Sequence, residues 1–223
     1  MTPPTGAKDG EPNGDHGPRL VLATANPHKA AEIAAILGSS VDLLPRPTEV
    51  PDVLEDADTL EGNARLKAEA ICGATGLPAL ADDTGLEVQA LGGDPGARAA
   101  RYAGEDGNAT ANMDLLLSEL AARHAVTTAD RAAAFRTVAL VRWPDGSEVL
   151  AKGVCRGRIA DHPAGDEGFG YDPVFQPADP ATGEPGDRTF AQMPAAEKDA
   201  ISHRGKALRA LAERLGLGPD RQS

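Results

Sequence analysis

The chain has 223 residues, enough for one large domain or two closely packed lobes, and its 41% hydrophobic residues predict a globular fold. The formal net charge of −12 argues against a nucleic-acid-binding or membrane-surface protein, because either would need a basic face. We therefore expect no nucleic-acid and no membrane partner. A small anionic ligand would require a local cluster of cations, a metal ion, or both.

Composition also predicts how the chain is divided. Residues 1–18 are rich in Pro, Gly and Asp and contain no apolar run, so we expect a disordered tail and not a signal peptide. No stretch approaches the roughly 20 apolar residues of a membrane span. Cys72 and Cys155 form no C-x-x-C pattern, which is typical of buried thiols in a reducing compartment. These features predict a soluble cytoplasmic protein with a domain at 19–217 and a C-terminal tail at 218–223.

The first half of the chain alternates strands and helices. Strands are predicted at 19–24 and 41–45, and helices at 27–38 and 59–75. In the first helix, apolar residues recur at helical spacing at Ala30, Ile33, Ala34 and Leu37, which predicts the buried face. The stretch "ALADDTGLEV" (79–88) then predicts two short strands around a turn at residues 83–85, because Asp, Thr and Gly all favour turns.

The second half of the chain is richer in strands. A helix is predicted at 108–124, capped by Asn108, and a second capped helix closes the chain at 202–216. Two long strands, 132–143 and 147–160, are joined by the hairpin signal "PDGS", and 179–187 reads as a polar surface loop. This order predicts an α/β (α+β) fold around a mixed sheet.

The first candidate for chemistry is "TANPHK", between the first strand and the first helix. A helix N-terminus offers free N–H groups and a partial positive charge to an anion. The segment comprises Thr24, Ala25, Asn26, Pro27, His28 and Lys29. An ordinary helix cap with a solvated lysine explains the same residues.

The second candidate lies within residues 54–68, where acidic residues crowd the loop before a helix. Glu55, Asp56 and Lys67 fall here, and the adjacent pair Asp82–Asp83 follows. Mg²⁺ takes one or two protein carboxylates and completes its shell with water and phosphate oxygens. The alternative is that the acids complement the helix dipole and the lysine is a surface residue.

Two further segments carry aromatic and cationic residues. Three of the seven aromatic residues of the chain fall within 165–175, where a ring could stack on a flat ligand or could simply fill a Gly-rich turn. In 197–208, Lys198, His203 and Arg204 gather around a helix start, which a capped helix with surface cations would also explain. Lysines for phosphates, carboxylates for a metal and aromatics for a base together indicate a nucleotide site.

Six blocks of this sequence resemble the inosine/xanthosine triphosphate pyrophosphatase family. They are "TANPHK", "NARLKA", "ALADDTGLEV", "PGARAARYAGE", "GFGYDPVF" and "AISHRGKAL", in the family's order, over about Leu20–Leu215. The resemblance implies Mg²⁺-dependent hydrolysis of the non-standard purine nucleotides dITP, ITP and XTP to the monophosphate and pyrophosphate. It also implies a homodimer and, within 19–217, a single domain with an elongated mixed β-sheet flanked by helices and two lobes around a central cleft.

The same resemblance assigns roles to residues. It implies that Asp83 is the general base and, with Glu55, a metal ligand. Adjacent carboxylates at a strand edge would then divide their roles, so we expect Asp82 to hydrogen-bond backbone or a cation. The residues implied to hold the triphosphate are Thr24, Ala25, Asn26, Pro27, His28, Lys29 and Lys67. Those implied to line the nucleoside site are Thr84, Phe169, Gly170, Tyr171, Asp172, Lys198, His203 and Arg204.

The chain departs from the family's pattern at one helix start and leaves one assignment open. The family's usual T-F-x-E-N-A helix start is "TLEGNA" here, and "LEDADT" leaves either Glu55 or Asp56 as the acidic partner. Two other classes of protein also fit parts of the pattern. One is a Maf-type nucleotide pyrophosphatase with another base preference, and the other is a nucleotide-binding module without catalysis.

Overall fold

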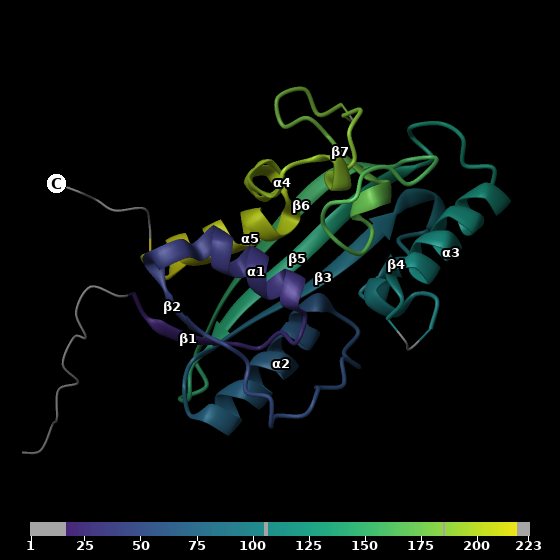
Figure 1. The fold of residues 1–223 in the computed structure, drawn as a ribbon. Coiled ribbons are helices and arrows are strands. Elements are labelled where there is room, and N and C mark those ends of the chain that lie inside the picture. Colours follow the sequence, from purple (N-terminus) through teal and green to yellow (C-terminus); the bar gives the residue numbers. More distant parts are fainter. Residues whose placement is uncertain (1–16, 105–106, 185, 218–223) are drawn as a thin grey trace, which may run out of the picture.

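A seven-stranded mixed sheet organises the protein (Figure 1). The computed structural model describes residues 17–104, 107–184 and 186–217. The strands are β1 (Arg19–Leu22), β2 (Asp42–Leu44), β3 (Ala79–Val88), β4 (Pro95–Gly96), β5 (Ala132–Arg142), β6 (Glu148–Ile159) and β7 (Phe175–Pro177). Their order is β2-β1-β3-β5-β6-β7, with β4 paired to β3. β1 runs parallel to β2 and β3 and the remaining pairs are antiparallel, which confirms the predicted mixed sheet.

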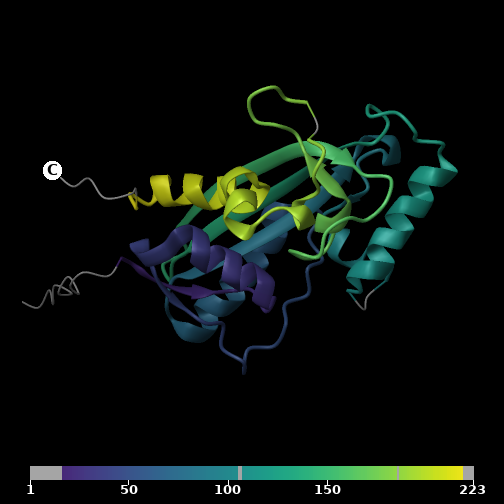
Figure 2. The same ribbon diagram turned by 45° about the horizontal axis from the view of Figure 1, so that its top comes forward.

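Helices cover both faces of this sheet. α1 (Pro27–Leu37) and α5 (His203–Arg214) lie side by side in Figures 1 and 2 and share a hydrophobic core with Leu80 of β3. α2 (Leu60–Thr75) shares a second core with Ala79 and Ala81. Because side chains alternate along a strand, these two cores lie on opposite faces of β3. α3 (Ala109–Ala122) packs in a third core at the other end of the sheet.

Most of the predicted helix starts and faces are confirmed. Asn108 and Ser202 cap α3 and α5, with side-chain oxygens that accept the N–H groups of Ala111 and Gly205. In α1 the predicted inward face is narrower than expected, because Ile33 and Leu37 are buried whereas Ala34 is exposed. Ala30 is half-buried and packs against the same core, so three of the four predicted positions carry the packing of this helix.

The predicted turn inside "ALADDTGLEV" is wrong. These residues form one continuous strand, β3, and all ten pair with β5, from Ala79 opposite Arg142 to Val88 opposite Ala133. Gly85 has a different purpose from a turn: a Cβ there would lie 2.7 Å from the carbonyl oxygen of Gly96. The glycine allows β4 to approach β3 closely, so a residue typical of turns lies in mid-strand.

Some elements were not predicted, and some predictions lie outside the described residues. The short strand β7 and the helix α4 (Ala195–Ile201) were missed, because neither is long enough to show a periodic pattern. Both cysteines are buried, as expected. The predicted tails, apart from residues 17 and 18, lie outside the described residues. None of the helices in the described part of the chain combines the length and apolar character needed to cross a bilayer.

Candidate active site

The four predicted segments meet around one cavity of about 720 Å³, a size typical of small-molecule sites. Its lining includes nearly all the residues singled out from the sequence: Thr24, Ala25, Asn26, His28, Lys29, Glu55, Lys67, Asp83, Thr84, Phe169, Gly170, Tyr171, Asp172, Lys198, His203 and Arg204. Pro27 is the exception, since it is exposed at the first position of α1 and does not line the cavity. Asp56 is likewise exposed and absent from the lining, whereas Glu55 lines it.

The start of α1 is capped, so part of its expected anion-binding capacity is already used. Asn26 Oδ1 accepts the N–H groups of His28 (2.9 Å) and Lys29 (3.2 Å), and Thr24 Oγ1 accepts the N–H of Asn26 (3.2 Å). The expectation of free N–H groups at these two positions is therefore wrong. The Thr24 hydroxyl proton remains for a ligand, and Lys29 is not solvated: its side chain is 18% exposed and faces Asp82, with 3.4 Å between Nζ and Oδ2.

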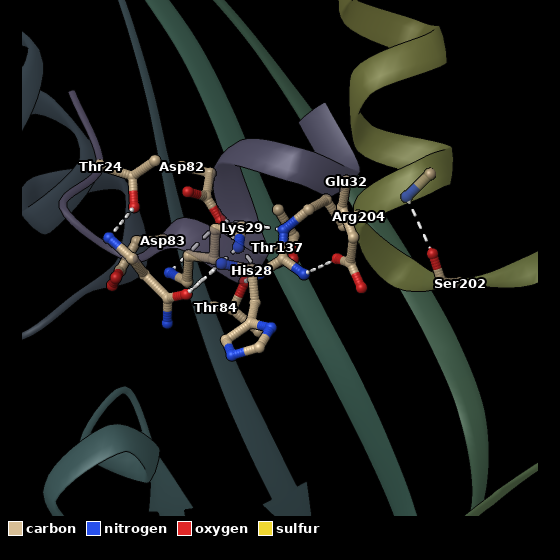
Figure 3. A network of polar contacts seen from close by, with 12 residues as sticks. Thr24, His28, Lys29, Glu32, Asp82, Asp83, Thr84, Thr137, Ser202 and Arg204 are labelled. Carbon is tan, nitrogen blue, oxygen red and sulfur yellow. Dashed lines mark hydrogen bonds and ion pairs between the residues drawn. The ribbon is translucent and has the colours of Figure 1, made fainter. Parts of the chain in front are cut away.

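The adjacent aspartates point to opposite faces of β3 and meet different cations, and Figure 3 shows Asp82 close to Lys29 and Arg204. Asp82 faces α1 and α5, where its Oδ2 accepts two hydrogen bonds from the guanidinium of Arg204, each 3.2 Å long. Asp83 faces α2, where it accepts hydrogen bonds from Lys67 (2.9 Å) and Asn63 (3.2 Å). Two neighbouring carboxylates can be buried in mid-strand because each has its own charged partner. Asp82 therefore binds a cation, one of the two roles expected for it.

Glu55, Lys67 and Asp83 form a compact group in the wall of the cavity. Lys67 Nζ lies 3.0 Å from Glu55 Oε1 and 2.9 Å from Asp83 Oδ1. Burial raises the pKa of Asp83 above its usual value, although the charges of Lys67 and Lys29 oppose this. The pKa of Lys67 is itself raised, because the surrounding carboxylates outweigh the effect of burial. A carboxylate with a raised pKa is a better proton acceptor near neutral pH.

The same group fits a divalent cation. One ammonium group lies within hydrogen-bond distance of both carboxylates, so Glu55 and Asp83 converge on a point that a positive charge can occupy. In the described part of the chain no cluster of three or more His, Cys, Asp or Glu could hold a metal. A Mg²⁺ ion bound by Glu55 and Asp83 would therefore need oxygens from water and substrate phosphates, a donor set that it commonly takes.

Phe169 lies beside the first turn of α1. Its ring is 5.3 Å from that of His28 in a stacked arrangement, and the charged groups of Lys198 and Arg204 lie 5.0 and 5.6 Å from its centroid. Phe175, by contrast, packs in the hydrophobic core. Residues 165–175 thus contribute one aromatic ring to the cavity wall and another to the hydrophobic core.

Glu32 of α1 is a site residue that the sequence reasoning missed. Its carboxylate accepts hydrogen bonds from Lys198 (2.6 Å) and from Arg204, and Lys198 also bonds Asp172 (2.6 Å). These contacts link α1 with α4 and α5 beside the cavity, and Figure 3 shows the contact between Glu32 and Arg204. The signal was present: Glu32 follows Lys29 by three residues, so both side chains lie on one side of the helix.

Arg204 and His203 line the cavity, but few of their N–H groups remain available to a ligand. The guanidinium donates to Asp82, Glu32 and the Thr84 hydroxyl, so four of its five N–H groups are engaged. The His203 ring stacks on Phe135 at 4.4 Å. Burial, together with the nearby cations, holds its pKa well below the usual 6.5, so the imidazole is neutral.

Four charged or amide-bearing residues of the lining had no predicted role: Arg46, Asp52, Arg101 and Asn112. Arg101 belongs to "PGARAARYAGE", a block that contributed to the family resemblance without any residue being assigned. Arg46 and Asp52 lie in the irregular loop after β2, where Arg46 donates to the carbonyl of Pro51 (2.9 Å). No periodic pattern marks such a loop, so only the folded structure brings these residues to the cavity.

Comparison with known proteins supports the resemblance. A family model described as "Ham1 family" matches residues 20–214. A curated dITP/XTP pyrophosphatase from Streptomyces avermitilis is 47% identical over 198 residues, covering 86% of this chain and 94% of the relative. One from Streptomyces coelicolor is 46% identical with the same coverage.

The solved Ham1 protein of Staphylococcus aureus is 38% identical with a TM-score of 0.74, covering 89% of this chain and 98% of its own. A solved nucleoside-triphosphatase / dITP/XTP pyrophosphatase from Mycobacterium abscessus is 42% identical with a TM-score of 0.67, covering 88% and 98%. The chain belongs to the Ham1 family.

Proposed function

We propose that this protein hydrolyses dITP, ITP and XTP to the nucleoside monophosphate and pyrophosphate, and so removes non-standard purines from the nucleotide pool. The relatives named above as dITP/XTP pyrophosphatases support this activity. The observation that carries the proposal is the convergence of Glu55, Lys67 and Asp83 in a cavity whose wall also holds a half-buried aromatic ring. Such a cavity offers carboxylates and cations to a phosphate chain and a flat surface to a base.

The roles proposed for the residues follow their placement. Asp83 accepts or orients the proton of the attacking water, and its raised pKa suits that task. Lys29 and Lys67 offset the charge of the phosphates, and the Thr24 hydroxyl donates to them. Glu55 and Asp83 would hold Mg²⁺, and Glu55 is favoured over Asp56 because Glu55 lines the cavity whereas Asp56 does not. When bound, that ion neutralises charge on the phosphate chain during phosphoryl transfer.

Base selection is proposed to rest on hydrogen-bond donors. Hypoxanthine and xanthine present a 6-oxo acceptor, whereas adenine presents a 6-amino donor. The one N–H group of Arg204 left free by its neighbours, the single N–H of neutral His203, and nearby backbone N–H groups would favour the acceptor. A site built on hydrogen bonds can reject adenine by several orders of magnitude, whereas guanine shares the 6-oxo group and would have to be rejected at position 2.

Isotope labelling tests the reaction. If water attacks the α-phosphorus of dITP, turnover in ¹⁸O-enriched water places the label in dIMP and leaves pyrophosphate unlabelled. Label in pyrophosphate would show attack at the β-phosphorus, and release of orthophosphate would show a different bond being broken. Either result would contradict the proposed reaction.

Two further features remain proposals. The family resemblance leads us to propose a homodimer in the cytoplasm, and light scattering would test the dimer through a particle of twice the chain mass of 22.9 kDa.

The family match over 20–214 does not favour a Maf-type enzyme. A nucleotide-binding module without catalysis would be indicated by tight binding of dITP with no product.

A further inference from the structure

Arg101 reaches from the far end of the sheet toward the segment that carries Glu55. It closes a short 3₁₀ helix, η3 (Ala99–Arg101), which follows β4 and lines the cavity. Its Nη2 donates a hydrogen bond to the backbone carbonyl of Glu55, 46 positions earlier in the chain. We propose that Arg101 is a positioning residue that fixes Glu55 in the cavity wall.

The backbone that carries this arginine is itself fixed. The buried hydroxyl of Tyr171 donates to the carbonyl of Ala99 (2.9 Å). The buried side chain of Asn112 donates to the carbonyl of Ala100 (3.0 Å) and accepts the N–H of Ala103 (2.7 Å). Side chains from two other parts of the chain thus hold both sides of η3. Because its backbone is held in place, Arg101 can orient the distant segment that carries Glu55.

The segment around Glu55, in contrast, is not held by apolar packing. Leu54 is 70% exposed and Asp56 is also exposed, so neither neighbour anchors it in a core. The polar contacts of Glu55 are the hydrogen bond from Lys67 to its carboxylate and the hydrogen bond from Arg101 to its carbonyl. Lys67 is shared with Asp83 and contacts only the side chain. Among the described residues, the Arg101 contact is the one that holds the backbone of Glu55 itself, and two residues later the N–H of Ala57 donates to Asn63 Oδ1 (3.0 Å).

Two separate consequences follow. The first is structural and needs neither substrate nor metal: without Arg101 the backbone near residue 54 should become more mobile. The second rests on the proposed function: if Glu55 holds a metal ion for hydrolysis, then loss of Arg101 should lower turnover through Glu55. Partners that orient metal ligands typically change activity about 10- to 100-fold when removed.

A spin label tests the structural consequence. Leu54→Cys provides an exposed labelling site, and the native Cys72 and Cys155 are buried, which limits background labelling. In the ligand-free protein, Arg101→Ala should narrow the nitroxide spectrum at position 54 and leave a label at Val126→Cys, a site that is 81% exposed in the native chain, unchanged. The Arg101→Lys variant keeps a hydrogen-bond donor, so its spectrum at position 54 should be intermediate between those of the native arginine and of Arg101→Ala. An unchanged spectrum at position 54 would overturn the proposal.

Kinetics test the second consequence. Arg101→Ala should lower kcat for dITP about 10- to 100-fold, and combining it with Glu55→Gln should cost much less than the product of the two separate losses. Fully multiplicative losses, or an effect on KM alone, would show that Arg101 contacts substrate directly and would overturn the proposal. Arg98→Ala, an exposed residue of the same loop, is the matched control. An inactive wild-type protein would refute the proposed function, whereas the label experiment would still decide whether Arg101 orders the segment.

Discussion

At the scale of single residues, the two adjacent aspartates have different environments and should respond differently to substitution. Asp83 lines the cavity beside Lys67 and accepts a hydrogen bond from Asn63, whereas Asp82 lies outside the lining and faces Arg204 and Lys29. Their separation follows from the alternation of side chains along β3. A strand can therefore present one carboxylate to a ligand while its neighbour holds the cations in place.

Asp83→Asn keeps the shape of the side chain and removes its capacity to accept a proton. We expect kcat for dITP to fall by about 10²- to 10⁴-fold, the usual contribution of a general base. Circular dichroism should show a cooperative, native-like unfolding transition. Asp42→Asn, which changes an exposed pair with Arg19, serves as the control. Near-normal turnover in the Asp83 variant would refute its assignment.

Glu32→Gln tests the newly found member of the site. Glu32 is 15% exposed and pairs with two buried cations, Lys198 and Arg204. Removing one partner of a buried ion pair typically costs about 3–5 kcal/mol, so urea unfolding should reveal a large loss of stability. Glu197→Gln, whose pair with Arg188 is exposed, should cost less than about 1 kcal/mol. Equal losses in the two variants would contradict a structural role for Glu32.

His203 gives the protein a specific pH dependence. Because the folded-state pKa lies well below 6.5, the unfolded chain binds a proton below that pH that the folded chain does not. The free energy of unfolding should therefore fall as the pH drops below 6.5, by up to about 1.4 kcal/mol per unit, with no contribution above it.

His203→Phe keeps the stacking on Phe135 and removes the titration. Urea unfolding at pH 7.5, 6.5 and 5.5 should show wild type losing stability relative to this variant only as the pH falls below 6.5. The exposed His162→Gln is the control. A difference between wild type and His203→Phe that is constant with pH would show that His203 titrates alike in the two states.

At the scale of elements, the close packing of α5 on β6 places His203 and Arg204 at the cavity. A Cβ at Gly153 would lie 2.0 Å from the carbonyl oxygen of His203 and 2.5 Å from the amide nitrogen of Ala207. The glycine thus allows the start of α5 to approach the sheet. Since backbone atoms cannot simply rotate away, a side chain at this position must displace the helix.

Gly153→Ala should therefore lower both stability and activity. Overpacking of this kind typically costs about 1–3 kcal/mol, measured by urea unfolding, and the shift of Arg204 should weaken discrimination between dITP and dATP. Gly73→Ala, at an open position in α2, should instead be neutral or stabilising by up to about 1 kcal/mol. Unchanged stability and selectivity in Gly153→Ala would contradict the role given to this contact.

At the scale of the whole molecule, periodic segments were predicted well and tertiary contacts were not. The hairpin of β5 and β6 and the capped helices α3 and α5 follow from local patterns of polarity and turn residues. The turn predicted within β3 was wrong because pairing with β5 outweighs the turn preference of Asp, Thr and Gly. Helical spacing places Glu32 on the same side of α1 as Lys29, but the partners of Glu32 and Arg101 lie 166 and 46 positions away, and no local pattern identifies them.

The cationic side chains of the site also come together only in the folded structure. A chain with a net charge of −12 brings Lys29, Lys67, Lys198 and Arg204 to one cavity. Three of these cations lie in different segments of the sequence, and each is neutralised by a carboxylate when no ligand is bound. The family resemblance indicated which residues would meet, and the structure shows which carboxylate faces which cation.

The most direct test is product analysis of dITP, XTP, dGTP and dATP with the purified protein, with Mg²⁺ and with EDTA. We predict rapid release of dIMP or XMP together with pyrophosphate, little product from dGTP or dATP, and no turnover in EDTA. Release of orthophosphate, equal turnover of all four nucleotides, or full activity in EDTA would contradict the proposed reaction, its base selection or its need for a metal ion, respectively.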